Sequence, residues 1–223
     1  MTEGDVVRLL FHKGSILIKG RVRVPYSSWD YRAKAFRALA KYYKEIVDFL
    51  KVNRVPFVDE VPDLPPCPRL KARIQLRDYQ AEAVKAWLKA GGRGVVVLPT
   101  GAGKTIVAMK AIEAVNKPAV VVVPTLDLVD QWASRLEDVF GVEVGRYTGG
   151  EKEIKALTVT TYDSAYMKAE ELGNKFMLVV FDEVHHLPAP SYSMIADMFI
   201  APYRMGLTAT YERSDGLHKR YPD

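Results

Sequence analysis

Cysteine, side-chain amides and long apolar runs are all scarce in this sequence. Cys67 is the only cysteine among the 223 residues, which excludes a disulfide framework and most thiolate metal sites and favours a reducing compartment. No apolar run reaches the roughly 18 residues of a membrane span, and the N-terminus lacks the apolar core of a signal peptide. Asparagine and glutamine occur three times each, a usage typical of thermophiles. The sequence therefore predicts a soluble, cytoplasmic protein with no membrane partner.

Positive charge is concentrated at the N-terminal end. The net charge of +5 lies wholly within residues 1–60, which hold twelve Lys and Arg against seven Asp and Glu, whereas the remaining residues hold twenty of each. This asymmetry indicates a polyanionic partner for the N-terminal part. Two interpretations of its basic and aromatic side chains stay open: a surface that contacts phosphates and stacks on bases, or a solvated helix face over a small core. The side chains concerned are Arg21, Arg23, Trp29, Tyr31, Arg32, Lys34, Arg37 and Lys41.

Residues 1–65 are predicted to form a small α+β domain. It would contain a hairpin of two strands (6–11 and 15–19), an amphipathic helix over 33–50 and a returning strand over 55–58. Five prolines follow within residues 56–68, so a linker and a domain boundary near residue 65 are expected. The second domain would then span residues 66–223.

A phosphate-binding loop is predicted within residues 94–109, which read GVVVLPTGAGKTIVAM. The run 95–98 has the β-branched, apolar character of a strand buried on both faces of a parallel sheet. An apolar pattern that suits a helix follows the glycines. Leu98 stands where the strict P-loop pattern GxxxxGK[ST] has glycine, so the loop is the PTGxGKT variant.

Each position of this loop has a chemical role. Glycines allow backbone N–H groups to approach phosphate at the N-terminus of a helix. Lys104 would add a point charge to the β- and γ-phosphates, and Thr105 would offer a hydroxyl to Mg²⁺. The nucleotide-binding residues predicted here are Thr100, Gly101, Ala102, Gly103, Lys104 and Thr105.

The segment LRDYQ precedes a helix expected over residues 78–90, upstream of the loop. An amide such as that of Gln80 presents a donor and an acceptor together, as reading the adenine edge requires.

Two further strands, 119–123 and 157–161, end in hydroxyl-bearing residues at the edge where open α/β sheets place their ligands. Thr125 and Thr161 could hold a phosphodiester backbone there or act as ordinary helix caps, and both interpretations stay open. Trp132, in the helix after the first of these strands, is predicted to be a core residue.

A fourth buried strand, 177–181, leads directly into the sequence DEVH. Asp182 would hold the Mg²⁺ of MgATP, largely through water, and Glu183 would orient or deprotonate the attacking water. His185 is better suited to couple the nucleotide to the far side of a cleft than to bind a metal, because no partner has zinc spacing. The predicted catalytic residues are thus Lys104, Asp182, Glu183 and His185.

The segments LRDYQ, PTGAGKT, VVPTLDLVDQW, TTYDS, DEVHH and GLTAT occur in this order. Together they resemble the first motor lobe of a superfamily 2 helicase, and DEVHHLPA with the N-terminal extension resembles the archaeal XPB family of DNA repair helicases. The resemblance implies an α/β fold: a RecA-like P-loop NTPase with a parallel sheet and flanking helices, preceded by a small α+β domain for damage recognition. It also implies ATP and Mg²⁺ as cofactors, DNA (forked or damaged duplex) as partner, a nuclease as a further partner, and a monomer in an archaeal-type cell.

The resemblance assigns further roles by position. Arg77 joins Gln80 in the adenine-side motif, and Thr125 and Thr161 fall in motifs that grip one DNA strand. Thr208, Ala209 and Thr210 match the element that couples hydrolysis to strand movement. Arg213 and Asp215 match an Arg-Glu-Asp element implicated in unwinding, but Ser214 replaces its acid, which puts that function in doubt.

The family closes two RecA-like lobes around ATP, and the second lobe supplies an arginine finger. Only thirteen residues follow Thr210, so the sequence is interpreted as the N-terminal half of a helicase, inactive or very weak in hydrolysis alone. Two alternatives stay open: the same lobe in an RNA helicase or a restriction motor, and a non-catalytic DNA-binding platform for a nuclease.

Overall fold

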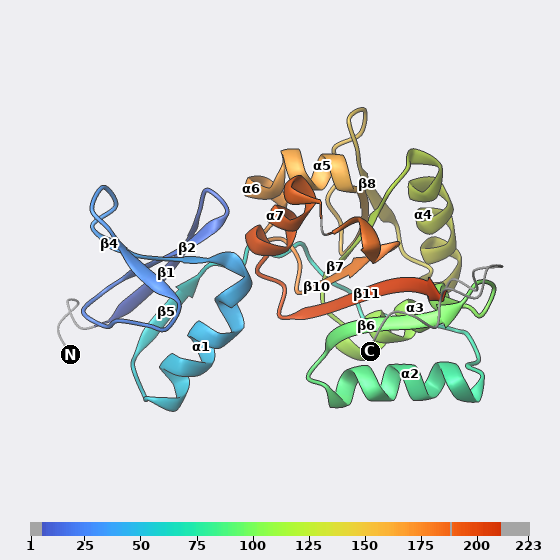
Figure 1. The fold of residues 1–223 in the computed structure, drawn as a ribbon, viewed down its shortest axis with the longest axis horizontal. Coiled ribbons are helices and arrows are strands. Elements are labelled where there is room, and N and C mark those ends of the chain that lie inside the picture. Colours follow the sequence, from blue (N-terminus) through green and yellow to red (C-terminus); the bar gives the residue numbers. More distant parts are fainter. Residues whose placement is uncertain (1–5, 188, 211–223) are drawn as a thin grey trace, which may run out of the picture.

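Two β-sheets organise the protein in the computed structural model, which describes residues 6–187 and 189–210. The first is a five-stranded sheet with strand order β3-β4-β2-β1-β5, and the second is a six-stranded sheet with order β6-β11-β10-β7-β9-β8. Figure 1 shows the N-terminal sheet beside the larger, helix-flanked one. None of the helices in these residue ranges has the length and apolarity needed to cross a membrane.

The N-terminal sheet is covered by a helix on one face only. Its strands are β1 (Val7–His12), β2 (Ser15–Lys19), β3 (Ser27–Asp30), β4 (Ala35–Leu39) and β5 (Phe57–Glu60). A short 3-10 turn (Ala40–Tyr42) leads into α1 (Tyr43–Val52), whose Ile46 and Leu50 pack against Leu9, Ile16 and Ile18 of the sheet. The hairpin predicted over 6–19 is confirmed, because β1 and β2 pair antiparallel in that register.

The helix predicted over residues 33–50 is wrong in its first half. Residues 35–39 form β4, which pairs with β2 on one side and β3 on the other. The turn before it holds Lys34 at φ +50°, a left-handed conformation that no helix contains. Apolar residues at 36, 39 and 40 fit helical spacing, but the tertiary pairing of two neighbouring strands outweighed that local preference.

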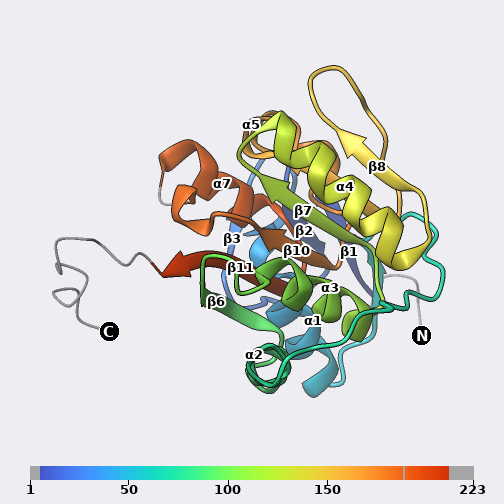
Figure 2. The same cartoon turned by 90° about the vertical axis from the view of Figure 1, so that its right-hand side faces the viewer.

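The second sheet is parallel throughout, as the α/β prediction requires. Its strands are β6 (Arg93–Pro99), β7 (Ala119–Val123), β8 (Val144–Tyr147), β9 (Leu157–Thr161), β10 (Leu178–Phe181) and β11 (Tyr203–Thr210). Apolar residues of α2 (Asp78–Lys89), α3 (Lys104–Val115) and α4 (Leu126–Phe140) form the core on one face. The opposite face is covered by α5 (Tyr162–Met167), α6 (Ala169–Leu172) and α7 (Pro190–Met198), and Figure 2 shows the two layers from the side.

One strand is less buried than its sequence predicts. The run 95–98 was expected to be covered on both faces, but β6 is an edge strand that pairs with β11 alone within the described residues. Val96 faces the core, whereas Val95 and Val97 are 56% and 51% exposed. Apolar composition reports a preference for burial, but the position of a strand in the sheet decides whether anything covers it.

Two ion pairs join the N-terminal part of the structure to the part that contains the larger sheet. Lys41 forms an ion pair of 2.9 Å with Asp197 of α7, and Arg93 of β6 forms one of 2.8 Å with Glu45 of α1. Residues 61–77 connect the sheets without helix or strand; Val61 packs in the first core and Leu70 in the second. The domain boundary near residue 65 stays a prediction.

Tyr147 of β8 is expected to make the protein sensitive to alkaline pH. Its hydroxyl donates to Glu171 at 2.7 Å, and burial, followed by that hydrogen bond, raises the pKa of Tyr147 to about 12. The folded state therefore favours the protonated tyrosine. Its contribution to the free energy of unfolding is fully present below pH 10 and is lost as pH rises toward 12. Urea unfolding at pH 9 and 11 should show wild type losing about 1 kcal/mol more than Tyr147→Phe. An equal loss in both proteins would contradict this assignment.

Candidate nucleotide site and nucleic-acid surface

The loop between β6 and α3 contains two glycines with left-handed backbone angles. Gly101 and Gly103 lie at φ +81° and +79°, and α3 begins immediately afterwards at Lys104. The left-handed backbone angle favours glycine at position 103, where an added Cβ would also meet the side-chain amide of Gln80. The predicted order of strand, glycine-rich loop and helix is confirmed.

The side-chain amide of Gln80 is hydrogen-bonded to this loop. Its side chain is 3% exposed, accepts a hydrogen bond from the N–H of Arg77 at 2.9 Å and donates one to the carbonyl of Ala102 at 2.9 Å. The hydroxyl of Tyr79 donates to the same carbonyl at 2.8 Å, a contact that the sequence analysis missed. Arg77 is the N-cap residue of α2. Contact of Gln80 and Arg77 with adenine stays a prediction. For Gln80 to donate to adenine through the same N–H, its hydrogen bond to the carbonyl of Ala102 would have to break.

Lys104 and Thr105 are half-buried at the first turn of α3. Lys104 forms no ion pair with any residue that the structure describes, so its ammonium group is available for phosphate. Its charge also acts on Asp182, whose pKa it lowers slightly. Because β6, β11 and β10 are adjacent and parallel, the phosphate loop and the end of β10 lie at the same edge of the sheet.

Asp182 follows β10 directly and is held by several hydrogen bonds. Its N–H donates to the carbonyl of Val122 at 2.9 Å, which continues the ladder with β7, and its Oδ1 accepts from the N–H of Glu183 at 3.0 Å. Burial raises the pKa of Asp182 above its usual value, while the hydrogen bond from Trp132 is the largest influence that lowers it. A carboxylate in this setting gains from a bound cation.

Glu183 has a left-handed backbone at φ +51°, which is uncommon for a residue with a side chain and is found at functional sites. Its carboxylate is about one third exposed and lies 3.6 Å from Nδ1 of His185. The two carboxylates thus differ in their partners, since Asp182 accepts a hydrogen bond from Trp132 whereas Glu183 lies beside His185.

Trp132 and Tyr162 also contact Asp182, and the sequence analysis did not detect these contacts. The indole N–H of Trp132 donates to Oδ2 of Asp182 at 2.9 Å, and the hydroxyl of Tyr162 donates to its main-chain carbonyl at 2.7 Å. Trp132 is 4% exposed, so the prediction that it belongs to the core is confirmed but incomplete. Its polar group is used at the site.

Thr125 and Thr161 are N-cap residues. The Oγ1 of Thr125 accepts from the N–H of Leu128 at 3.3 Å, and that of Thr161 accepts from the N–H of Ser164 at 3.1 Å. Thr125 is exposed, whereas Thr161 is buried. The capping interpretation is therefore confirmed for both, and their contact with DNA stays a prediction.

The predicted coupling element lies between the two halves of the site. Strand β11 is placed between β6, which leads into the phosphate loop, and β10, which leads into Asp182. Thr208, Ala209 and Thr210 pair with Val97, Leu98 and Pro99 at the end nearest the loop. Arg213 and Asp215 lie outside the described residues.

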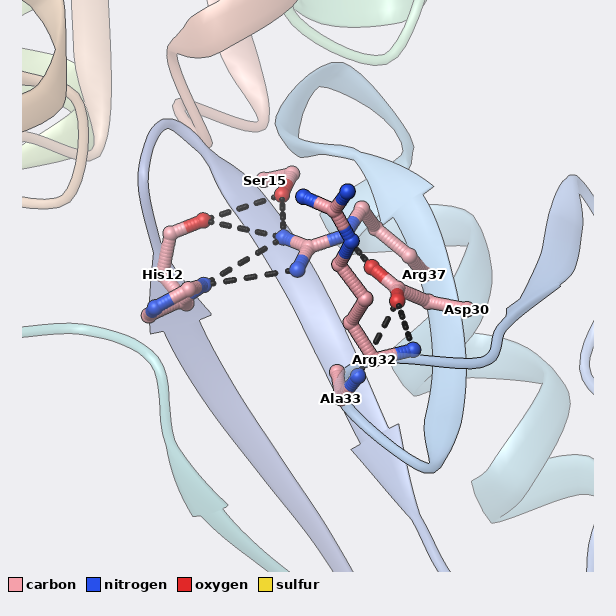
Figure 3. A network of polar contacts seen from close by, with 6 residues as sticks. All are labelled: His12, Ser15, Asp30, Arg32, Ala33 and Arg37. Carbon is pink, nitrogen blue, oxygen red and sulfur yellow. Dashed lines mark hydrogen bonds and ion pairs between the residues drawn. The ribbon is translucent and has the colours of Figure 1, made fainter.

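The open face of the N-terminal sheet carries a network around Arg37, drawn in Figure 3. The guanidinium group donates to Asp30 at 2.8 Å and to Ser15 at 2.6 Å, and it also reaches the main-chain carbonyl of His12. His12, Asp30 and Arg37 line a hollow of about 640 Å³ together with Lys13, Lys19 and Arg32. Within the described residues these last three form no ion pair. A basic surface therefore exists, although Arg37 itself is largely engaged.

Solved structures with a similar fold include two helicases. The UvsW helicase of bacteriophage T4 superimposes over 97% of this chain and 96% of its own, with a TM-score of 0.55 and 17% identity. The helicase domain of Hef from Pyrococcus furiosus covers 66% of this chain and 36% of its own, with a TM-score of 0.52 and 25% identity. Together with the P-loop and the DEVH strand end, the parallel sheet defines a RecA-like motor lobe of superfamily 2.

Sequence comparisons narrow this class. Residues 73–213 match the family described as "Type III restriction enzyme, res subunit", and residues 9–61 match "Xeroderma pigmentosum group B helicase damage recognition domain". The DNA 3'-5' translocase XPB2 of Sulfurisphaera tokodaii is 49% identical over 97% of this chain and 49% of its own length. The DNA 3'-5' helicase XPB of Mycobacterium tuberculosis is 39% identical over 64% of this chain and 28% of its own.

The chain belongs to the family described as "Type III restriction enzyme, res subunit", and its most similar regions in the relatives above are those of XPB-type helicases. It spans about half the length of the XPB2 relative and about a quarter of the mycobacterial one.

Proposed function

We propose that this chain is the ATP-binding and DNA-contacting N-terminal part of an XPB-type DNA helicase or translocase that acts in DNA repair. The observation that carries the proposal is the sheet order: β11 lies between the phosphate-loop strand and the DEVH strand, so three functional segments meet at one edge. Ligands bind at this edge of parallel α/β sheets.

The residues at this edge fit MgATP. Glycine suits position 103 because of its left-handed backbone angle at the start of α3, where backbone N–H groups can approach phosphate. Thr105 and Asp182 would hold Mg²⁺, since hydroxyl and carboxylate oxygens are the donors that this hard cation prefers. When bound, the ion neutralises charge on the β- and γ-phosphates.

Each side chain then has one task. Lys104 binds the phosphates, and Glu183 accepts a proton from the attacking water or orients it. His185 and residues 208–210 transmit the state of the nucleotide to DNA. In the whole protein a second lobe would supply the arginine that stabilises charge on the transferred phosphoryl group.

DNA contact is proposed at two places. Thr125 and Thr161 at the sheet edge would hold one strand, and the basic hollow around Lys13, Lys19 and Arg32 would contact phosphates. The similarity of residues 9–61 to a damage recognition domain supports the second contact. We further propose that the protein is a monomer, that it acts in the cytoplasm of an archaeal-type cell and that a nuclease is its partner.

The test uses this chain and fluorescent ATP. Lys104→Ala should weaken MgATP binding by about 10- to 100-fold, because a charge-assisted contact to phosphate is lost. Lys85→Ala, which removes an exposed lysine of α2, should leave the affinity unchanged. Forked DNA should bind more tightly than RNA of the same sequence. Equal MgATP affinity in the two variants, or tighter binding of RNA, would contradict the proposal.

A further inference from the structure

Asp182 is held from both faces of the large sheet. Trp132 of α4 reaches its carboxylate at 2.9 Å, and Tyr162 of α5 reaches its carbonyl at 2.7 Å. Trp132 packs in the core beneath α2, α3 and α4, whereas Tyr162 packs in the opposite core with α6 and α7. The two side chains are 4% and 1% exposed, so neither can change position without its helix.

The helix that carries Trp132 begins at the edge where DNA contact is proposed. Thr125 caps α4, and Trp132 follows it by two helical turns, about 10 Å along the same helix. The far end of this rigid segment is exposed at Thr125, and the near end donates to Oδ2 of Asp182. Displacement of α4 therefore changes the position of the carboxylate.

The carboxylate has few other constraints. Its Oδ1 accepts from the N–H of Glu183, the neighbouring residue in the chain, so the indole is the contact that ties it to a distant element. The bond from Tyr162 fixes the backbone of the same residue, because a carbonyl held at 2.7 Å resists rotation of the turn that follows.

We propose that Trp132 and Tyr162 are positioning residues that hold Asp182 between α4 and α5 and thereby link DNA contact to Mg²⁺-dependent nucleotide binding. The inference rests on the proposed function for its two ligands. Linkage is reciprocal: if DNA displaces α4 and alters the grip of Asp182, then Mg-nucleotide alters affinity for DNA by the same factor.

The chain offers matched controls for both side chains. The indole of Trp87 is also 4% exposed and donates at 2.9 Å, but to the carbonyl of Arg204. The buried hydroxyl of Tyr147 donates at 2.7 Å, but to Glu171. Trp87→Phe and Tyr147→Phe therefore remove equivalent groups without touching Asp182.

The first measurement is made on the wild-type chain, and variants serve only to assign its resonances. Indole N–H resonances of the ¹⁵N-labelled chain, assigned with the Trp→Phe variants, are recorded with ADP and EDTA, with ADP and Mg²⁺, and with forked DNA. The Trp132 resonance should shift with MgADP and with DNA, and shift less with ADP in EDTA, while the Trp87 resonance changes little. DNA that binds by fluorescence anisotropy without shifting the Trp132 resonance would overturn the inference.

The second measurement compares affinities. Mg²⁺ raises the affinity of the wild type for ADP by some factor, and Trp132→Phe and Tyr162→Phe should each reduce that factor about tenfold. The affinity for ADP in EDTA should stay at the wild-type value. The Trp87 and Tyr147 controls should lower Tm but leave the Mg²⁺ dependence intact. If all four variants lower Tm alike and keep that dependence, the two residues are structural only and the inference fails. Wild type that binds no MgADP would instead overturn the proposed function, and the inference with it.

Discussion

Replacing Glu183 by glutamine is expected to lower DNA-stimulated ATP hydrolysis by the whole protein about 10²- to 10⁴-fold, the range that a general base contributes. The amide keeps the size of the side chain and the left-handed turn at φ +51°, but it cannot accept the proton of water. Binding of MgATP should persist, because phosphate and Mg²⁺ contacts are assigned to other residues. Turnover is measured with and without forked DNA, and binding is measured separately.

A matched substitution separates chemistry from charge. Glu170→Gln removes one exposed negative charge from α6 and should leave both turnover and binding at the wild-type level. If Glu183→Gln hydrolyses ATP at a rate close to wild type, the water is activated elsewhere. If it binds MgATP poorly, Glu183 has a role in nucleotide binding that the geometry does not assign to it.

Replacing Trp87 by alanine is expected to lower the free energy of unfolding by about 3–5 kcal/mol. The side chain is buried in the core between α2 and the edge of the sheet, with its ring centroid 6.3 Å from that of Tyr203. Its loss would leave a cavity and remove the hydrogen bond to the carbonyl of Arg204, on the strand that leads to the predicted coupling element. Urea unfolding of the isolated chain measures the effect.

The adjacent residue provides the control for this prediction. Leu88 is 44% exposed, so Leu88→Ala should change the free energy of unfolding by about 0.5 kcal/mol or less. A small effect of Trp87→Ala would mean that α2 contributes little to the cooperative core.

The parts of the nucleotide site could be predicted because each part is a short continuous segment of the chain. A strand, a glycine-rich turn and the first turn of a helix place Lys104 and Thr105 through backbone geometry alone, and β10 places Asp182 in the same way. Trp132 could not be assigned to the site, since fifty residues separate it from Asp182 and an apolar helix pattern explains it equally well. The signal that could have found it was a buried indole, whose N–H needs an acceptor.

The position of Gln80 illustrates a second limit. Its motif predicts contact with adenine, but side-chain hydrogen bonding depends on which groups the fold brings within reach. Here Arg77 and Ala102 occupy both ends of the amide. Spacing along the chain defines which residue lies near the loop, whereas the packing of α2 on α3 decides which of its atoms are already bonded.

The sequence by itself determined the α/β class, the phosphate loop, the DEVH strand end and the basic N-terminal part, because each depends on local periodicity or on composition. Only the tertiary structure decided that residues 35–39 form a strand, that β6 lies at an edge with Val95 and Val97 exposed, and that two helices hold Asp182. The physical reason is the same in all three cases. Strand pairing, burial and side-chain hydrogen bonds are decided by partners far away in the chain, and local preference is weak enough for those partners to override it.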